Sequence, residues 1–219
     1  MTTQEQSTGH ESGDITAQAW LTWWVKDCLL QADPSWWRGK VRLPELPQRR
    51  DWLHVNAAQL HRHFSLPPLP TPDSFASLMH VSLMQIGALD TAQRETVLRL
   101  MARVCQPMRN LDRSDAEGIW CERLAKALRP GLWLPAQVTF SAPSSTPSPS
   151  ESFATGYQDA LLLLRIRYGE ACWPHLRLLF PRNWPHDGDN QCHIPTMSVP
   201  AARLNALCDA LIWKASAPT

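Results

Sequence analysis

Apolar residues recur at helical spacing along most of the chain, beginning with residues 15–31. There the apolar positions follow an i, i+3, i+4, i+8 pattern and are occupied by Trp20, Trp23, Trp24 and Cys28. This spacing places their side chains on one face of an α-helix. Pro34 follows, and it favours a short helical turn through Trp36 and Trp37.

A second helical pattern covers residues 53–64, where intervals of four, three and four residues separate Leu53, Ala57, Leu60 and Phe64. Asp51 is the predicted N-cap of this helix, since its carboxylate can accept from the first free N–H groups. The Pro-rich run at 67–72 then ends the pattern.

Four further segments combine a helical period with a start or stop signal. Asp90, with Gln93 three residues on, begins one of them, and Ser114 with Glu117 forms a capping box in another. Pro200 stands in the first turn of the last, whose apolar face comprises Leu204, Leu207, Cys208, Leu211 and Ile212. The four segments are residues 73–87, 90–105, 114–129 and 199–213.

The segment 157–169 is apolar nearly all round, as a buried helix or a buried strand would be. Its length and its lack of β-branched residues before Ile166 favour a helix. Residues 132–140 are the best candidate for a strand. We therefore predict an all-α fold of seven to nine Pro-punctuated helices, in a single irregular multi-helix domain over residues 14–219.

Two segments are predicted to lie outside the folded body. Residues 1–13 carry no large apolar side chain apart from Met1 and are expected to form a disordered tail. Residues 141–152 are rich in Ser and Pro and are expected to form a flexible loop.

Charge is balanced overall but uneven locally. Lys and Arg number 21 against 20 Asp and Glu, a formal net charge of +1, so no global field attracts nucleic acid or an acidic membrane. A local excess of positive charge lies between residues 38 and 62. Tryptophans interleaved with these basic residues could stack on bases. A basic patch on a neutral protein more often meets an acidic protein surface, and we predict no nucleic-acid partner. The basic residues are Arg38, Lys40, Arg42, Arg49, Arg50 and Arg62.

The six cysteines form no Cys-x-x-Cys pair, and four of them fall within apolar helical patterns. The N-terminus lacks the basic and apolar regions of a signal peptide, and no apolar run reaches the length of about 18 residues that a membrane span needs. We therefore expect reduced cysteines and a cytoplasmic location.

The histidines lack the spacing of a metal site. His61 and His63 point about 160° apart on the predicted 53–64 helix, because each residue advances about 100°. No two histidines are four residues apart, and no His-Glu-x-x-His motif occurs. His186, Cys192 and His193 form a loose group without the spacing of a structural zinc site. We expect no metal or other cofactor, and solvated histidines.

Motifs of catalysis are also missing from the sequence. It contains no Gly-x-Ser-x-Gly, no Gly-rich phosphate loop and no paired-carboxylate pattern. Residues 187–190, Asp-Gly-Asp-Asn, resemble the start of a calcium loop, but no Glu follows at the required position. Cysteines on apolar faces lack the positive surroundings that activate a thiolate. We predict no catalytic residue and no enzymatic activity.

One segment, residues 35–66, carries a recognisable series of motifs. Its residues are Trp37-Arg38, Leu46-Pro47, Arg50-Asp51 and Asn56-Ala57-Ala58-x-Leu60. The series resembles the N-terminal signature of the K component of bacterial type III secretion systems, the SctK family, which includes YscK and PscK. Weaker matches cover the Leu-rich helices from 78 to 105 and the segment 162–181. Residues 1–13, residues 141–152, His61 and His63 have no counterpart in the family.

The resemblance implies a helical, non-enzymatic adaptor of the injectisome sorting platform, needed for protein secretion and hence virulence. Such a protein links the cytoplasmic domain of the inner-membrane ring protein SctD to the pod protein SctQ. It therefore works at the cytoplasmic face of the inner membrane and meets the membrane only through the ring. The alternatives are a helical secretion chaperone or regulator and, as a weaker candidate, a nucleic-acid-binding module.

A docking surface is predicted around residues 36–51. Pro44 and Pro47 are expected to keep residues 43–50 out of both flanking helices, so that the turn projects. Arg49 and Arg50 would then sit just before a helix N-terminus, where the helix dipole disfavours cations and an acidic partner would compensate. Solvated side chains are the alternative. Trp and Arg dominate interface hot spots, although either Trp could instead fill the core. The predicted partner-binding residues are Trp36, Trp37, Arg38, Arg49, Arg50 and Asp51.

Overall fold

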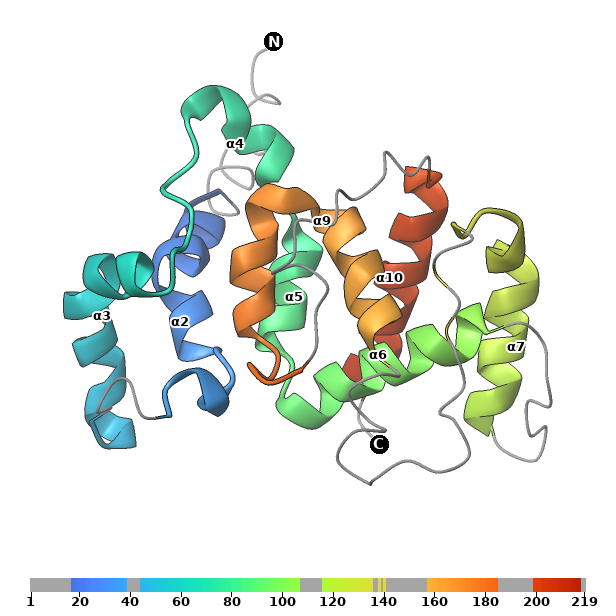
Figure 1. The fold of residues 1–219 in the computed structure, drawn as a ribbon, viewed down its shortest axis with the longest axis horizontal. Coiled ribbons are helices and arrows are strands. Elements are labelled where there is room, and N and C mark those ends of the chain that lie inside the picture. The colour runs from blue at the N-terminus through green and yellow to red at the C-terminus, as the bar shows by residue number, and fades with distance from the viewer. Residues whose placement is uncertain are drawn as a thin grey trace, which may run out of the picture. The chain divides into compact units, whose positions relative to one another are not determined.

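Helices make up the regular structure of this protein. The computed structural model describes residues 17–38, 44–106, 116–135, 138, 140, 157–184 and 199–217. Within these ranges there are eight α-helices, three short helical turns and no strand (Figure 1). The predicted all-α class is confirmed. The predicted tail 1–13 and loop 141–152 lie outside the described residues.

The chain divides into two compact units within the predicted domain. Unit 1 contains residues 1–88 and 170–182, and unit 2 contains residues 89–169 and 183–219. The predicted helix at 157–169 is confirmed and continues beyond its predicted end as α9 (Gln158–Leu178), so the unit boundary between residues 169 and 170 falls inside α9. Gly169 breaks α9 with φ 76° and ψ 167°, a backbone conformation that residues with a Cβ rarely adopt. The two halves of α9 therefore belong to different units.

The first helical segment of unit 1 carries the predicted tryptophan stripe. It runs through residues 17–22, the π-helical turn η1 (Trp23–Asp27) and α2 (Cys28–Leu30). All four predicted apolar positions, Trp20, Trp23, Trp24 and Cys28, are buried. The predicted turn at Pro34 is confirmed as the 3₁₀ turn η2 (Pro34–Trp36), capped by the Asp33 carboxylate, which accepts from the N–H of Ser35 at 2.9 Å.

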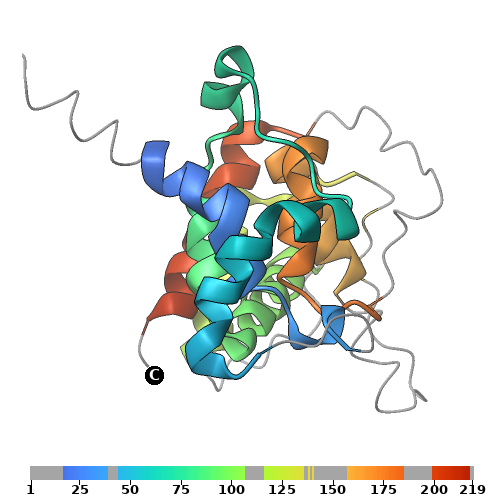
Figure 2. The ribbon, with the colours of Figure 1, turned by 90° about the vertical axis from the view of Figure 1, so that its left-hand side faces the viewer.

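Helix α3 (Leu46–His63) begins seven residues earlier than predicted. Its N-cap is Glu45, not Asp51, and Pro47 stands in its first turn. The prediction was wrong because a proline in the first turn removes no hydrogen bond from the helix. The N–H groups of that turn have no partner inside the helix. The predicted packed face is confirmed for Leu53, Ala57 and Leu60, which are buried. Helix α3 lies beside η1 and α2 (Figure 2).

The single helix predicted over residues 73–87 is two helices, α4 (Pro72–Leu78) and α5 (Val81–Ala88). The break falls at Met79, whose extended backbone (φ −75°, ψ 95°) no sequence signal announces. The second half of α9 completes unit 1. There the N–H of Asp33 donates to the carbonyl of Leu178 at 2.7 Å, which ties the end of α9 to the chain just before η2.

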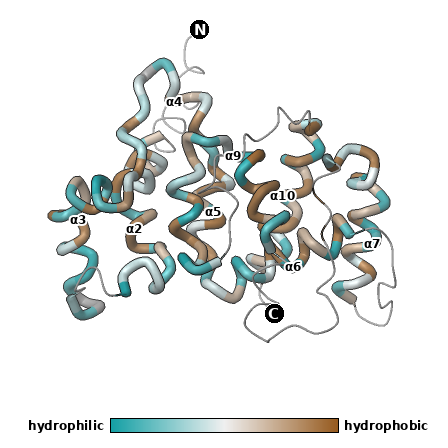
Figure 3. Tube along the Cα trace, viewed as in Figure 1, coloured by the Kyte–Doolittle hydropathy of each residue, from teal (hydrophilic) through white to brown (hydrophobic). Residues whose placement is uncertain are grey.

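Unit 2 is built around α6 (Thr91–Cys105), which packs against α7 (Ala116–Leu128) and α10 (Ala201–Ser216). The predicted start of α6 is confirmed: Asp90 and Gln93 form a reciprocal capping box. The predicted apolar face of α10 is buried in full, and Figure 3 shows hydrophobic stretches along that helix. The 3₁₀ turn η3 (Pro130–Leu132) ends at the first residue of the region proposed as a strand, residues 132–140, and that region holds no strand among its described residues.

The predicted capping box of α7 pairs Ser114 with Glu117, and Ser114 lies outside the described residues. Its other member, Glu117, is bonded to Arg99 and Arg103 of α6. Among the helices that the structure describes, none combines the length and apolar character needed to span a bilayer.

Candidate functional site

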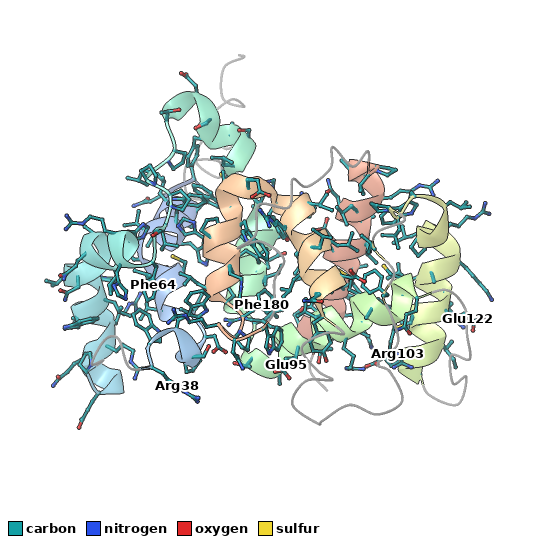
Figure 4. All side chains as sticks on the ribbon, in the orientation of Figure 1. Arg38, Phe64, Glu95, Arg103, Glu122 and Phe180 are labelled. Atoms are coloured by element: carbon teal, nitrogen blue, oxygen red, sulfur yellow. The ribbon has the colours of Figure 1, made fainter. Side chains whose placement is uncertain are left out.

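The two tryptophans of the predicted docking surface make contacts inside unit 1. Trp37 is 8% exposed and packs edge-on against Phe64, which is labelled in Figure 4, with 5.1 Å between the ring centroids. Trp36 is half-buried, and its indole N–H donates to the carbonyl of Phe180 at 2.8 Å. The guanidinium of Arg177 lies 5.2 Å from the centroid of the Trp36 ring. The core-filling alternative therefore holds for Trp37, and Trp36 is anchored internally.

The charged members of that surface divide between exposed and half-buried positions. Arg38, Arg50 and Asp51 are exposed, whereas Arg49 is half-buried, and its Nε is buried with no hydrogen-bond partner among the described residues. The predicted projecting turn does not form, because Arg49 and Arg50 lie within the first two turns of α3. Within the described residues, no ion pair engages Arg38, Arg50 or Arg62.

An exposed stripe runs along α3 opposite its packed face. Asp51, Val55, Ala58 and Arg62 follow one another at intervals of four, three and four residues, and all are exposed. Val55 is 85% exposed, so it adds apolar area to this stripe. This stripe and Arg50 together form what we call the α3 outer face.

A second group of side chains, which the sequence did not reveal, meets inside unit 1. Cys28 of α2, His61 of α3 and His175 of the second half of α9 each offer one metal-ligating atom, and these three atoms lie within 4.8 Å of one another. Cys28 and His175 are buried and His61 is half-buried. Three separate helical segments thus place a thiol and two imidazoles together.

Backbone carbonyls of the π-helical turn hold two members of this cluster. The Cys28 thiol donates to the carbonyl of Trp24 at 3.3 Å, and Nε2 of His61 lies 2.9 Å from the carbonyl of Val25. A carbonyl oxygen can only accept, so Nε2 of His61 is the donor, and in the neutral imidazole Nδ1 then carries the lone pair. Single π-helical turns such as η1 are frequent at functional sites.

His175 is the most unusual member of the cluster. Its exposure is 0%, and neither ring nitrogen has a hydrogen-bond partner among the described residues. Its ring lies against that of Trp24, with centroids 3.8 Å apart, and edge-on to His61 at 5.7 Å. Burial, with a smaller effect of the neighbouring His61, lowers the pKa of His175 to about 3; the backbone of Trp24 lies close enough to oppose this shift slightly, but it does not meet hydrogen-bond geometry. The imidazole is therefore neutral, with one lone pair and one N–H.

The buried thiols are not activated nucleophiles. Burial raises the pKa of Cys28 and of Cys105 well above the ordinary thiol value, that of Cys172 to about 11 and that of Cys208 to about 12. A thiolate nucleophile needs the opposite shift. Without a positive partner, Cys28 therefore remains a thiol. Five of the described cysteines are free and buried: Cys28, Cys105, Cys121, Cys172 and Cys208.

The cluster escaped prediction because its members are far apart in the sequence. Spacing rules compare residues on one helix or one loop, and they find no partner for His61 on its own helix. The predicted solvated state is correct for His63, which is exposed, and wrong for His61, which is half-buried. The loose group His186, Cys192 and His193 lies outside the described residues.

No protein-family model, no curated protein and no solved structure matches this chain.

Proposed function

We propose that this protein is a cytoplasmic, non-enzymatic adaptor of a type III secretion system. It links an SctD-like inner-membrane ring protein to an SctQ-like pod protein of the sorting platform. It binds no nucleic acid and meets the membrane only through the ring. The resemblance of residues 35–66 to the SctK signature is the starting point, and the all-α fold agrees with it.

The observation that carries the proposal is the way the signature residues divide in space. One half maintains the fold: Trp37, Ala57 and Leu60 are buried. The other half faces outward and has no described ion-pair partner to stabilise it. The outward half consists of Arg38, Arg50, Asp51 and Ala58. A pattern needed only for packing would have no outward half, so we assign the exposed half to a partner.

The chemistry of that half favours an acidic protein surface. Arg38 and Arg50 are exposed and belong to the local basic excess between residues 38 and 62. Exposed arginines offer bidentate hydrogen bonds to carboxylates and speed association with an oppositely charged partner. Val55, on the α3 outer face, adds apolar area beside these charges.

The experiment measures binding of the full chain to the SctQ-like protein and to the cytoplasmic domain of the SctD-like protein from the same genome. We expect calorimetry to detect a complex with each. Combining Arg38→Glu with Arg50→Glu should weaken at least one complex about thirtyfold, which corresponds to ~2 kcal/mol. It should also stop secretion.

A matched control reverses two exposed arginines of unit 2, Arg123→Glu with Arg129→Glu, which changes net charge by the same amount. This control should bind normally. If the unaltered chain binds neither partner, the adaptor proposal is wrong. If it binds both partners and the Arg38/Arg50 variant binds as well as the control, the adaptor stands and the docking surface lies elsewhere.

A further inference from the structure

We propose that Cys28, His61 and His175 form a binding site for one Zn²⁺ ion in unit 1. Nothing in the adaptor function requires such an ion. The site is separate from the α3 outer face, because His61 belongs to the side of α3 that contacts η1, through its bond to Val25.

The geometry suits a small tetrahedral cation. Zinc bond lengths of about 2.1 Å to nitrogen and 2.3 Å to sulfur put neighbouring ligand atoms about 3.5 Å apart. The three atoms of the cluster already lie within 4.8 Å of one another, so small side-chain rotations would bring them to this spacing. Three helical segments supply one ligand each: α2, α3 and the second half of α9.

The unpartnered imidazole of His175 is the independent sign of a ligand. A polar group buried without a hydrogen bond is destabilising, and such groups are rare in proteins. His175 is fully buried, and both of its nitrogens lack partners among the described residues. An ion at the cluster would bind the lone pair of one of them.

The ligand types select the metal. A thiolate with two neutral imidazoles suits zinc, while Mg²⁺ and Ca²⁺ require oxygen ligands, and the cluster contains no carboxylate. Zinc binds the thiolate form, so Cys28 would release its proton when the ion enters. Because Nε2 of His61 is bonded to the Val25 carbonyl, its Nδ1 keeps the lone pair, the arrangement typical of a metal-ligating histidine.

Three protein ligands leave one of four tetrahedral positions for water or an exogenous group. The ion would cross-link segments that are distant in sequence and so would stabilise unit 1. The Trp24 ring, which lies against His175 with an angle of 33° between the ring planes, restricts the orientation of one ligand.

The test uses the full chain, purified without an affinity tag and stripped of metal. Calorimetry with Zn²⁺ should give one equivalent, and Co²⁺ in its place should give a thiolate-to-metal charge-transfer band. Cys28→Ala and His175→Gln should each weaken Zn²⁺ binding at least 100-fold and abolish that band. Two controls should bind as the unaltered chain does: His63→Gln, exposed two residues from His61, and Cys172→Ala, a second buried thiol of unit 1.

Retention of the ion by folded Cys28→Ala or His175→Gln would place the metal elsewhere and overturn the proposal. So would the absence of Zn²⁺ binding by the folded, unaltered chain. If a ligand variant fails to fold, the Co²⁺ spectrum of the unaltered chain decides, since a spectrum without a thiolate band excludes Cys28. These outcomes do not depend on SctQ-like or SctD-like proteins and so leave the adaptor proposal untouched.

Discussion

The indole N–H of Trp23 donates to the side-chain oxygen of Gln31 at 2.7 Å, and Gly87 of α5 lies against this pair. A Cβ added at Gly87 would stand 2.2 Å from Oε1 of Gln31 and 2.8 Å from Nε1 of Trp23. Both distances are shorter than non-bonded atoms tolerate. The hydrogen bond therefore depends on the missing side chain of a residue far along the chain.

Gly87→Ala should destabilise unit 1 by about 1 kcal/mol. Displacing Gln31 leaves the buried indole N–H without its acceptor, which costs roughly 1–3 kcal/mol, and the better helix propensity of alanine offsets about 1 kcal/mol. Urea denaturation followed by circular dichroism measures the difference. Gly131→Ala is the control, because a Cβ there has nothing within 4 Å. Equal stability of the two variants would contradict the prediction.

Glu117→Gln should lower the stability of unit 2 by about 1 kcal/mol near neutral pH. Its carboxylate binds both Arg99 and Arg103, and the Arg99 Nη2 to Glu117 Oε2 distance is 3.0 Å. The hydrogen bond from Arg99 is the main cause of the lowered pKa of Glu117. The folded state therefore favours the ionised form, and its stabilisation is complete above the ordinary pKa of 4.5.

As the pH falls through the lowered pKa of Glu117, that stabilisation disappears. The difference in unfolding free energy between the unaltered chain and Glu117→Gln should therefore shrink below about pH 4.5, and denaturant titrations at several pH values would measure it. Glu95→Gln serves as the control, since Glu95 is exposed on the same helix as Arg103 (Figure 4). A pH-independent difference would show that the ion pairs do not contribute.

Trp36→Phe should cost about 1 kcal/mol, because it removes the hydrogen bond to the Phe180 carbonyl and weakens the contact with Arg177. The loss is limited, since Nη1 of Arg177 also donates to that carbonyl, at 3.1 Å. Thermal melts followed by circular dichroism would compare the stability of Trp36→Phe with that of a control, Trp213→Phe, at a position that is 67% exposed. If both substitutions are neutral, the internal role assigned to Trp36 is wrong.

Leu53→Ala and Val55→Ala test the orientation of α3. Leu53 is 1% exposed, so truncating it should cost roughly 2–5 kcal/mol, while Val55 at 85% should change stability by less than about 0.5 kcal/mol. Val55→Ala should instead weaken binding to a partner that docks on the α3 outer face. The midpoint of urea unfolding gives the first comparison and calorimetry the second.

Sequence reasoning succeeded where one helix face carried the whole signal. The Leu204 to Ile212 face of α10 and the capping box at Asp90 depend on neighbours within a few residues, and both are confirmed. It failed at the start of α3, because a proline in the first turn, such as Pro47, is compatible with a helix. It also missed the break at Met79, which lacks Gly or Pro punctuation.

The candidate site was less predictable than the fold. Exposure of Arg38, Arg50 and Asp51 could be expected from their charge, but the internal bonds of Trp36 depend on residues 177–182. Cys28, His61 and His175 come together only through packing of three helical segments. A local motif cannot report such long-range proximity.

The break of α9 at Gly169 has a consequence for synthesis of the protein. Unit 1 takes its last segment, residues 170–182, after residues 89–169 of unit 2 have been made. At about 5–20 residues per second, the ribosome needs roughly 4–16 s to cross that interval. During this time the nascent chain holds Trp20 and Trp24 without the helix that brings His175 against Trp24. We expect the growing polypeptide to bind chaperones during this interval. Mutations that slow the completion of unit 1 should therefore lower the yield of folded protein and leave its final stability unchanged.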